Sequence, residues 1–280
     1  MSEQATARGD DEPAAEVVLD IHRPHSARMY DFFLGGTTNF EPDRVAAAQT
    51  LAVFPHAPLA ARANRAFMHR SARMLAESGI TQFLDIGTGI PTSPNLHEIV
   101  QAVDPACRVV YADNDPIVLI HAQALLRSSA EGRTAYIQAD VRDPEHVLDA
   151  VEKTGVLDLD RPVALSMNAL LHFVPDDDGA HEIAQAFKDR LRAPGSALAI
   201  SHFTPDHAPQ DAARAARVYR EAGTLVQART REEFARFFTG WDLLEPGIVP
   251  TPRWRPDAES ALSPVSDAHA SCYGAVAVRP

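Results

Sequence analysis

The sequence predicts an α/β fold in which a doubly wound, mostly parallel, seven-stranded sheet is joined by a helical N-terminal cap. Five short apolar runs alternate with helical stretches from residue 80 onward, and the connections between them are short. The runs lie at 82–87, 108–113, 134–140, 161–168 and 196–203. Repeated β–α alternation of this kind indicates parallel strands with helices on both faces of the sheet. A final pair of strand candidates brings the expected number of strands to seven.

The segment before the sheet predicts helices. Residues 1–20 are rich in Ala, Asp and Glu without apolar periodicity, so we expect a disordered tail. Residues 41–54 and 57–79 carry apolar side chains at helical spacing, and Gly79 is a typical helix stop. We therefore interpret residues 21–79 as a helical N-terminal cap.

The remaining boundaries follow from changes in periodicity. Helix candidates near 94–103, 115–128, 144–153 and 179–192 separate the strands, which makes 80–203 the core. A helical insert over 204–240 comes next, with a candidate helix near 210–227 and a capping box formed by Thr230 and Glu233. Strand candidates at 241–249 and 271–278 form a C-terminal strand pair within 241–280. No clear linker interrupts 21–280, so we expect one domain.

Composition excludes some classes of function. The chain has 280 residues, 38 acidic and 26 basic, for a formal charge of -12. Such a surface repels a polyanion on average, so we expect no nucleic-acid partner. The two cysteines lack disulfide or metal-site spacing, and no histidine pair belongs to a recognisable ligand set, so no metal is expected. The polar N-terminus and the absence of a long apolar run predict a cytoplasmic protein without a membrane segment.

A glycine loop follows the first predicted strand. Asp85, Gly87, Thr88 and Gly89 belong to the sequence DIGTG, in which glycines let the backbone turn and approach a ligand. Two glycines alone also suit a nicotinamide dinucleotide, or a plain strand-to-helix turn. The missing third glycine of the dinucleotide fingerprint, the nearby Pro91 and the lack of basic residues favour S-adenosyl-L-methionine (SAM), which has no phosphate.

Two further strand ends carry acidic residues. Asp113 falls 24 residues after Gly89, where a carboxylate can accept hydrogen bonds from both ribose hydroxyls, and Asn114 would lie beside the adenine. Asp140 can accept from the adenine amino group, while Val141 packs against the ring. Each aspartate alone is also compatible with a simple turn. The three strand ends in order predict one SAM site.

The fourth strand end adds a possible catalytic group. Asn168 is expected near the methionine part of SAM, because carboxyl ends of parallel strands line the ligand crevice. His172 follows closely, and a histidine can act as a general base near neutral pH. A purely structural histidine is the competing interpretation.

Four segments together resemble a known family: HSARMYDFFLGGTTNFEPDR (25–44), RANRAF (62–67), FLDIGTGIPTSPNLHE (83–98) and VVYADNDPIVL (109–119). This set is similar to the actinobacterial SAM-dependent methyltransferase family known mainly as a domain of unknown function. The resemblance runs from about residue 20 to the C-terminus and is most specific in the Tyr-Asp-x-x-x-Gly-Gly block; Thr37-Thr38 is a small departure. It implies a class I Rossmann-like fold and SAM as ligand, and leaves the acceptor open.

The aromatic block 25–44 is interpreted as part of the cap. Tyr30, Phe32, Phe33 and Phe40 could enclose a sulfonium through cation–π attraction, with Tyr30 near the methionine end, or simply anchor the cap to the core. Tyr30 is a second candidate for a catalytic base. Arg65, and also Arg28, are candidates to bind the SAM carboxylate.

We therefore expect an enzyme, a SAM-dependent methyltransferase that modifies an unidentified acceptor, most simply a small molecule. A non-catalytic SAM-binding sensor or partner protein is the alternative, because the sequence specifies no catalytic residue. An NAD(P)-dependent oxidoreductase is less favoured, since neither lysine follows a tyrosine by four residues. The oligomeric state is not predicted.

Overall fold

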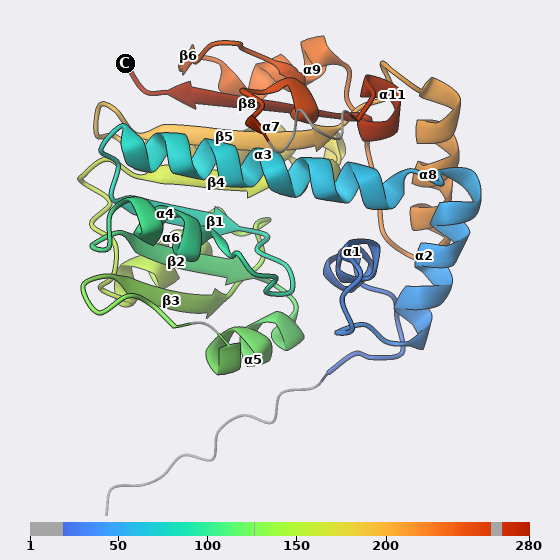
Figure 1. Cartoon of the computed structure of the whole chain (residues 1–280), viewed down its shortest axis with the longest axis horizontal. Helices are drawn as coiled ribbons and strands as arrows, with labels where there is room; N and C mark the ends of the chain where they lie inside the picture. Colours follow the sequence, from blue (N-terminus) through green and yellow to red (C-terminus); the bar gives the residue numbers. More distant parts are fainter. Residues whose placement is uncertain (1–18, 126, 259–264) are drawn as a thin grey trace, which may run out of the picture.

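One sheet forms the centre of the molecule. The computed structural model describes residues 19–125, 127–258 and 265–280. The sheet has the order β3-β2-β1-β4-β5-β8-β6, and β7 also pairs with β8 (Figure 1). The strands are β1 (Gln82–Ile86), β2 (Arg108–Asp113), β3 (Arg133–Gln138), β4 (Ala164–Asn168), β5 (Ala197–Phe203), β6 (Asp242–Leu243), β7 (Val249–Pro250) and β8 (Cys272–Val278). The tail expected at 1–20 falls almost entirely outside the described residues.

Strand direction agrees with a doubly wound fold. β1 to β5 pair in parallel, whereas β8 runs antiparallel to β5, β6 and β7. The expected fold class is therefore confirmed. The segment predicted as one strand at 241–249 forms two two-residue strands, because a turn closed by the Gly247 amide and the Leu244 carbonyl separates them. Pro246 within that turn has no N–H for a sheet ladder.

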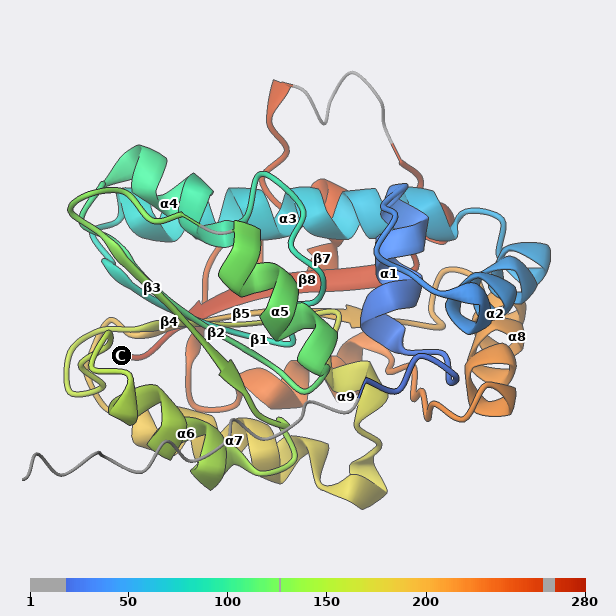
Figure 2. The same cartoon turned by 90° about the horizontal axis from the view of Figure 1, so that it is seen from below.

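Helices cover both faces of the sheet (Figure 2). On one face lie α3 (Ala57–Glu77), α4 (Leu96–Val103) and α5 (Pro116–Leu125). On the other lie α6 (Pro144–Lys153), α7 (Ala180–Arg190) and α9 (Arg231–Ala235). The chain also forms short helices: η1 (Leu171–Phe173), η2 (Asp176–Asp178), η3 (Arg236–Phe238), η4 (Thr251–Arg253) and α11 (Asp267–Ala270).

Hydrophobic layers pack on both faces of the sheet, which explains why its central strands are continuous runs of apolar residues. Every residue of β1 is buried, as expected for a central parallel strand covered on both faces. Phe67 and Leu75 of α3 pack on one face with Val109. Val147 of α6 and Phe187 of α7 pack on the other. These layers fix the sheet and hence the positions of its carboxyl ends.

A group of helices covers the carboxyl ends of the strands. α1 (Ser26–Leu34), α2 (Glu41–Val53), the first turns of α3, and α8 (Pro209–Glu221) lie together at that side of the molecule in both views (Figures 1 and 2). They share a small core that includes Met29, Phe33, Ala47, Phe54 and Ala215. The helical insert α8 therefore supports the N-terminal helices although about 150 residues separate them in the chain.

The double glycine of the 25–44 block ends α1. Gly35 has φ 85°, and the Gly36 amide donates to the Asp31 carbonyl at 2.9 Å, which closes the helix as a left-handed cap. The Asp31 carboxylate then accepts from the Asn39 amide at 2.8 Å. Asp31, the glycines and Asn39 thus fix the path from α1 to α2.

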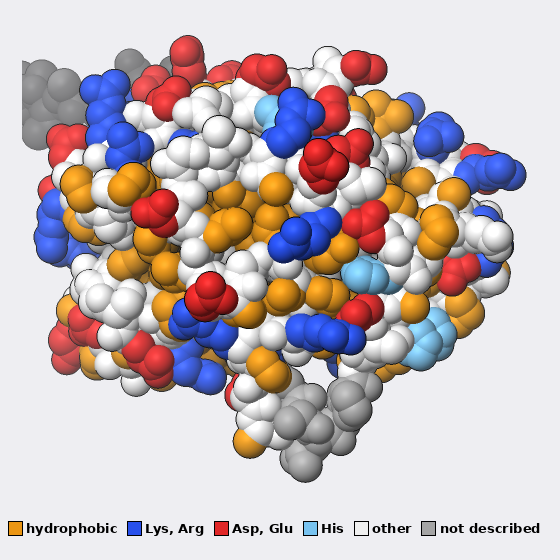
Figure 3. Space-filling view, turned by 90° about the horizontal axis from the view of Figure 1, so that it is seen from above, with side chains coloured by type: hydrophobic (Ala, Val, Ile, Leu, Met, Phe, Trp, Pro, Cys, Tyr) orange, Lys and Arg blue, Asp and Glu red, His pale blue; other side chains and the backbone are white. Residues whose placement is uncertain are grey.

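The surface carries charges of both signs. On the face shown in Figure 3, Lys and Arg side chains are scattered among Asp and Glu rather than gathered in one area. Within the described part of the chain, no helix combines the length and the apolar character needed to cross a bilayer.

Candidate functional site

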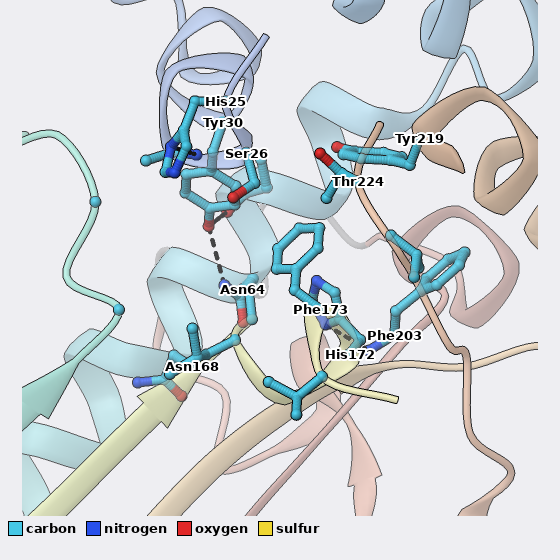
Figure 4. A pocket seen from close by; sticks show the side chains of 18 of the residues that line it. His25, Ser26, Tyr30, Asn64, Asn168, His172, Phe173, Phe203, Tyr219 and Thr224 are labelled. Atoms are coloured by element: carbon cyan, nitrogen blue, oxygen red, sulfur yellow. Dashed lines mark hydrogen bonds between the residues drawn. The ribbon is translucent and has the colours of Figure 1, made fainter. Parts of the chain in front are cut away.

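A cavity of about 530 Å³ lies between the carboxyl ends of the parallel strands and the covering helices. Figure 4 shows side chains from α1, α3, β4 and the α8 region pointing toward it. β1 lies between β2 and β4, so the strand order reverses here, and such a switch point is where open α/β sheets bind ligands. Of the site residues expected from the sequence, Arg28 does not line this cavity, whereas twelve others do: Tyr30, Arg65, Asp85, Gly87, Thr88, Gly89, Asp113, Asn114, Asp140, Val141, Asn168 and His172.

The glycine loop is held against β2. The Gly87 amide donates to the Ala112 carbonyl at 2.8 Å, and the Thr88 hydroxyl donates to the Asp85 carbonyl at 3.1 Å. Gly87 and Gly89 have φ of 73° and 67°, in the left-handed region that favours glycine. A Cβ at Gly87 would lie 2.7 Å from the Leu170 side chain, whereas a Cβ at Gly89 would meet nothing within 4 Å.

Asp85 is a buried carboxyl group at the end of β1. Burial raises its pKa to about 7, while a hydrogen bond from Ser166 and the positive charge of Arg65 lower it. Its side chain is therefore poised between the neutral and charged forms near neutral pH. A cationic ligand group beside it would favour the charged form.

Asp113 binds the glycine loop directly. Its Oδ2 accepts from the Gly89 amide at 2.8 Å, and its Oδ1 accepts from the Asp115 amide at 3.0 Å. Burial raises the pKa of Asp113, and these two amides oppose that rise. Asp115 accepts in turn from the Ile117 amide at 3.0 Å and so caps the start of α5.

The adjoining strand ends form the next part of the wall. The Asn114 amide donates to Asp140 at 3.3 Å, and the other Asp140 oxygen accepts from the Arg142 amide at 2.9 Å. Val141 is buried beside them. A polar edge and an apolar face therefore lie together, as an adenine ring requires.

A chain of polar side chains links the cap to the end of β4. Tyr30 donates to the Ala61 carbonyl at 2.9 Å and accepts from the Asn64 amide at 2.9 Å. Asn64 also accepts from the Ser201 hydroxyl, which in turn accepts from the Ala169 amide at 2.9 Å. Ala169 has φ 52°, so this network stabilises an uncommon backbone conformation immediately after Asn168.

The two side chains proposed from the sequence as bases are poorly prepared to accept a proton. Burial, together with the positive charge of Arg229, lowers the pKa of His172 to about 3. The His172 Nδ1 accepts from the Phe203 amide at 3.4 Å, so the available lone pair is already used (Figure 4). Burial raises the pKa of Tyr30 to about 12. Both side chains are therefore neutral wall residues at pH 7.

The two arginines considered for the SAM carboxylate differ in position and in hydrogen-bond partners. Arg65 lines the cavity, but it donates to the backbone carbonyls of Thr92 and Pro94 in the loop after the glycines. Arg28 lies outside the cavity lining, 3.4 Å from Asp43 and 3.5 Å from Asp115. Arg28 thus joins α1 to the β2–α5 connection instead of facing a ligand.

The aromatic block of the cap is divided between two environments. Tyr30 and Phe33 line the cavity, whereas Phe32 packs within the small cap core and Phe40 packs beside Ile90 and Ile117. Phe33 belongs to that core as well. The block therefore contributes side chains both to the cavity wall and to the packing of the cap.

The cavity has a near half at the strand ends and a far half beneath the covering helices. The sequence did not reveal the far half. Its wall comes from elements distant in the chain: Phe54, Phe173, Phe203, Tyr219, Thr224 and Leu225. Arg229 holds the loop that carries Phe173, because it donates to the Leu171 and Val174 carbonyls at 3.0 and 2.9 Å and pairs with Asp176 at 2.7 Å. The sequence predicted a helix near 210–227, but the spacing of its apolar residues does not show what that helix covers.

The near half has the chemical groups that SAM requires. Asp85, Asp113 and Asp140 line it with carboxylates, which are the kind of acceptor that hydroxyl, amino and ammonium groups of a ligand need. The Asn168 Oδ1 is buried without a hydrogen-bond partner among the described residues, and Asn168 lines the cavity. Such an orphaned acceptor is costly unless a ligand supplies a donor. The open space beside Gly89 admits a ligand close to the backbone.

Comparison with known proteins identifies the family. The model of the S-adenosyl methyltransferase family matches residues 12–280. A DUF574 family protein from Streptomyces avermitilis MA-4680 is 48% identical, with a TM-score of 0.89 over 93% of this chain and 99% of that one. A candidate methyltransferase from Thermobifida fusca YX is 38% identical, with a TM-score of 0.84 over 93% and 96%. No curated protein matches. The chain therefore belongs to the S-adenosyl methyltransferase family and is a SAM-dependent methyltransferase.

Proposed function

We propose that this enzyme transfers the methyl group of SAM to a small molecule bound in the far half of the same cavity. The observation that supports the proposal is the continuity of the cavity, which joins the strand-end carboxylates to the aromatic wall in a volume of about 530 Å³. Cavities of about 300–1,000 Å³ are typical of small-ligand sites.

In this proposal Asp113 binds the ribose, Asn114, Asp140 and Val141 bind the adenine, and Asp85 and Asn168 bind the ammonium of the methionine part. SAM supplies an electrophilic methyl group: the acceptor lone pair forms the new bond to carbon, the carbon–sulfur bond breaks, and sulfur keeps that electron pair. His172 and Tyr30 are not assigned as the base, because His172, with a pKa of about 3, is a weak base and Tyr30, with a pKa of about 12, keeps its own proton at neutral pH. The protein acts mainly by alignment and exclusion of water, which can contribute about 7–11 kcal/mol.

The size of the acceptor can be tested with SAM labelled on its methyl carbon. The purified enzyme is incubated with a cell lysate that has been separated by size into small molecules and macromolecules. We expect label to appear in the small-molecule fraction and to require active enzyme. A boiled-enzyme reaction is the control. Label incorporated only into protein or nucleic acid would contradict the proposal.

The raised pKa of Asp85 predicts a pH dependence of SAM binding. If its charged form binds the ammonium, binding must release the Asp85 proton below pH 7, so the SAM Kd should fall about tenfold from about pH 6 to about pH 7.5. Calorimetry across this range measures the change, and D85N should remove most of it. In the ligand-free protein the sign is opposite: the folded state holds the extra proton, so the contribution of Asp85 to stability falls as the pH rises from about 4 to about 7. A wild-type Kd independent of pH would exclude the contact.

A further inference from the structure

The far half of the cavity differs in chemistry from the near half. We call it the acceptor compartment and define it by Phe33, Phe54, Phe173, Phe203, Tyr219 and Leu225. Its members are connected: Phe33 and Phe54 share one hydrophobic cluster with Phe203 and Tyr219, and the rings of Phe173 and Tyr219 lie 5.8 Å apart. Leu225 is 49% exposed and so brings an apolar side chain to the rim.

Charged side chains are confined to the other half. The Lys, Arg, Asp and Glu residues that line the cavity come only from α3 and the strand ends: Arg65, Asp85, Asp113, Asp140 and Arg142. α1, α2, α8 and the segment after α8 contribute none to the described lining. A charged acceptor in the compartment would therefore lose water without gaining a counter-ion, which is strongly unfavourable. An uncharged acceptor avoids this cost.

The wall also has a preferred shape. Phe173 and Tyr219 present two ring faces at an interplanar angle of 51°, and Ala57 and Ala215 leave space beside them. Aromatic side chains of this kind favour flat rings through offset or edge contacts, in addition to the free energy of apolar burial.

Two hydroxyl groups offer polar contacts at one end. Tyr219 is the last aromatic residue of α8, and the Thr224 amide donates to its carbonyl at 2.8 Å, so both residues lie at the same end of the compartment (Figure 4). Among the described residues, neither hydroxyl has a hydrogen-bond partner. Burial raises the pKa of Tyr219, so its hydroxyl keeps its proton and can donate. These groups would pair with an oxygen or nitrogen of a bound ligand.

We infer that the acceptor is an uncharged, largely apolar small molecule with at least one flat ring, bound in the acceptor compartment with a polar group at Tyr219 and Thr224. The inference rests on the proposed function, since it names the substrate class of that same site. It assigns acceptor selectivity to the cap and α8, and cofactor binding to the strand ends.

The test compares matched probes on the enzyme saturated with S-adenosylhomocysteine. Calorimetry measures the Kd of phenol, 2-naphthol and 2-hydroxyanthracene, each against the carboxylate and the aminomethyl cation of the same ring. We expect at least one neutral member to bind about tenfold or more tightly than both charged partners. The inference is overturned if no neutral member is preferred on any ring.

Two variants locate the binding. Y219F should weaken the preferred neutral probe about two- to tenfold through loss of one hydrogen bond. A215F should block the compartment, whereas A213F, at an exposed position of the same helix, should leave probe binding unchanged. Equal probe binding by A215F and A213F would place the ligand elsewhere and overturn the inference. If A215F does not fold, the test rests on Y219F, and an unchanged probe Kd in Y219F overturns the inference.

S-adenosylhomocysteine binding is the internal control throughout. If this binding is intact and the neutral probes show no preference, only the substrate class is wrong. If the enzyme binds the cofactor and the probes but labels only macromolecules in the fractionated lysate, the proposed function fails instead.

Discussion

Replacing Asp113 with alanine is expected to weaken SAM binding by about 100-fold or more. Each Asp113 oxygen accepts one backbone amide, from Gly89 or Asp115, and each keeps a second lone pair for a ligand hydroxyl. Two charge-assisted hydrogen bonds are worth about 1.5–3 kcal/mol each, and every 1.4 kcal/mol is about tenfold in Kd. The Gly89 amide also loses its acceptor, which loosens the glycine loop.

Matched variants separate ligand contacts from loop support. D113N keeps one oxygen acceptor without the charge, so its Kd should lie between those of wild type and D113A. Asp149 is an exposed carboxylate on α6, and D149A should leave the Kd unchanged. Thermal unfolding without SAM reports folding in each variant. A folded D113A enzyme with wild-type affinity for SAM would remove the ribose contact and with it the proposed order of the strand ends.

The strand ends could be predicted because their information is local. A parallel strand covered on both faces is a short run of apolar residues, and its carboxyl end meets those of its neighbours at one edge. The helix that follows Gly89 begins with Asn95, whose amides bind Glu98, and Thr230 begins α9 in the same way. The residues of such a cap are neighbours in the sequence, so these two helices begin close to where the sequence predicts them.

Chemical roles were harder to predict, because they depend on burial and on distant partners. His172 has the right residue type for a base, but the fold buries it beside Arg229, so its pKa falls to about 3. Asn64 and Ser201 pair across 137 positions of sequence to support the backbone after Asn168. Nothing in the sequence near His172 or Asn168 indicates these partners.

The acceptor compartment depends on tertiary packing even more strongly. Ala215 and Tyr219 belong to α8, and they reach the site only because that helix packs against α2. The sequence indicated a helix near 210–227 without indicating its neighbours. Apolar residues at helical spacing show that a helix has a buried face, but they do not show whether that face covers protein or ligand.

Replacing Gly87 with alanine is expected to damage both the fold and the cofactor site. The left-handed backbone at Gly87, with φ 73°, costs an L-residue about 1–2 kcal/mol, and its Cβ would lie 2.7 Å from the Leu170 side chain. Leu170 follows Asn168 at the end of β4, so relief of the contact displaces a second wall of the cavity. We expect G87A to lower the free energy of unfolding by about 2 kcal/mol or more and to weaken SAM binding at least about tenfold.

Gly89 provides the matched comparison, because it has a similar φ of 67° but open space around its Cβ position. G89A should lose only the backbone contribution to stability, about 1–2 kcal/mol, whatever its effect on SAM binding. Adding L170A to G87A should recover the steric part of the loss and leave the backbone part. Denaturant unfolding without SAM and calorimetry with SAM measure the two effects separately. Equal unfolding free energies for G87A and G89A would show that the Leu170 contact does not constrain the loop, because the glycine at 87 would then be required only for its backbone conformation.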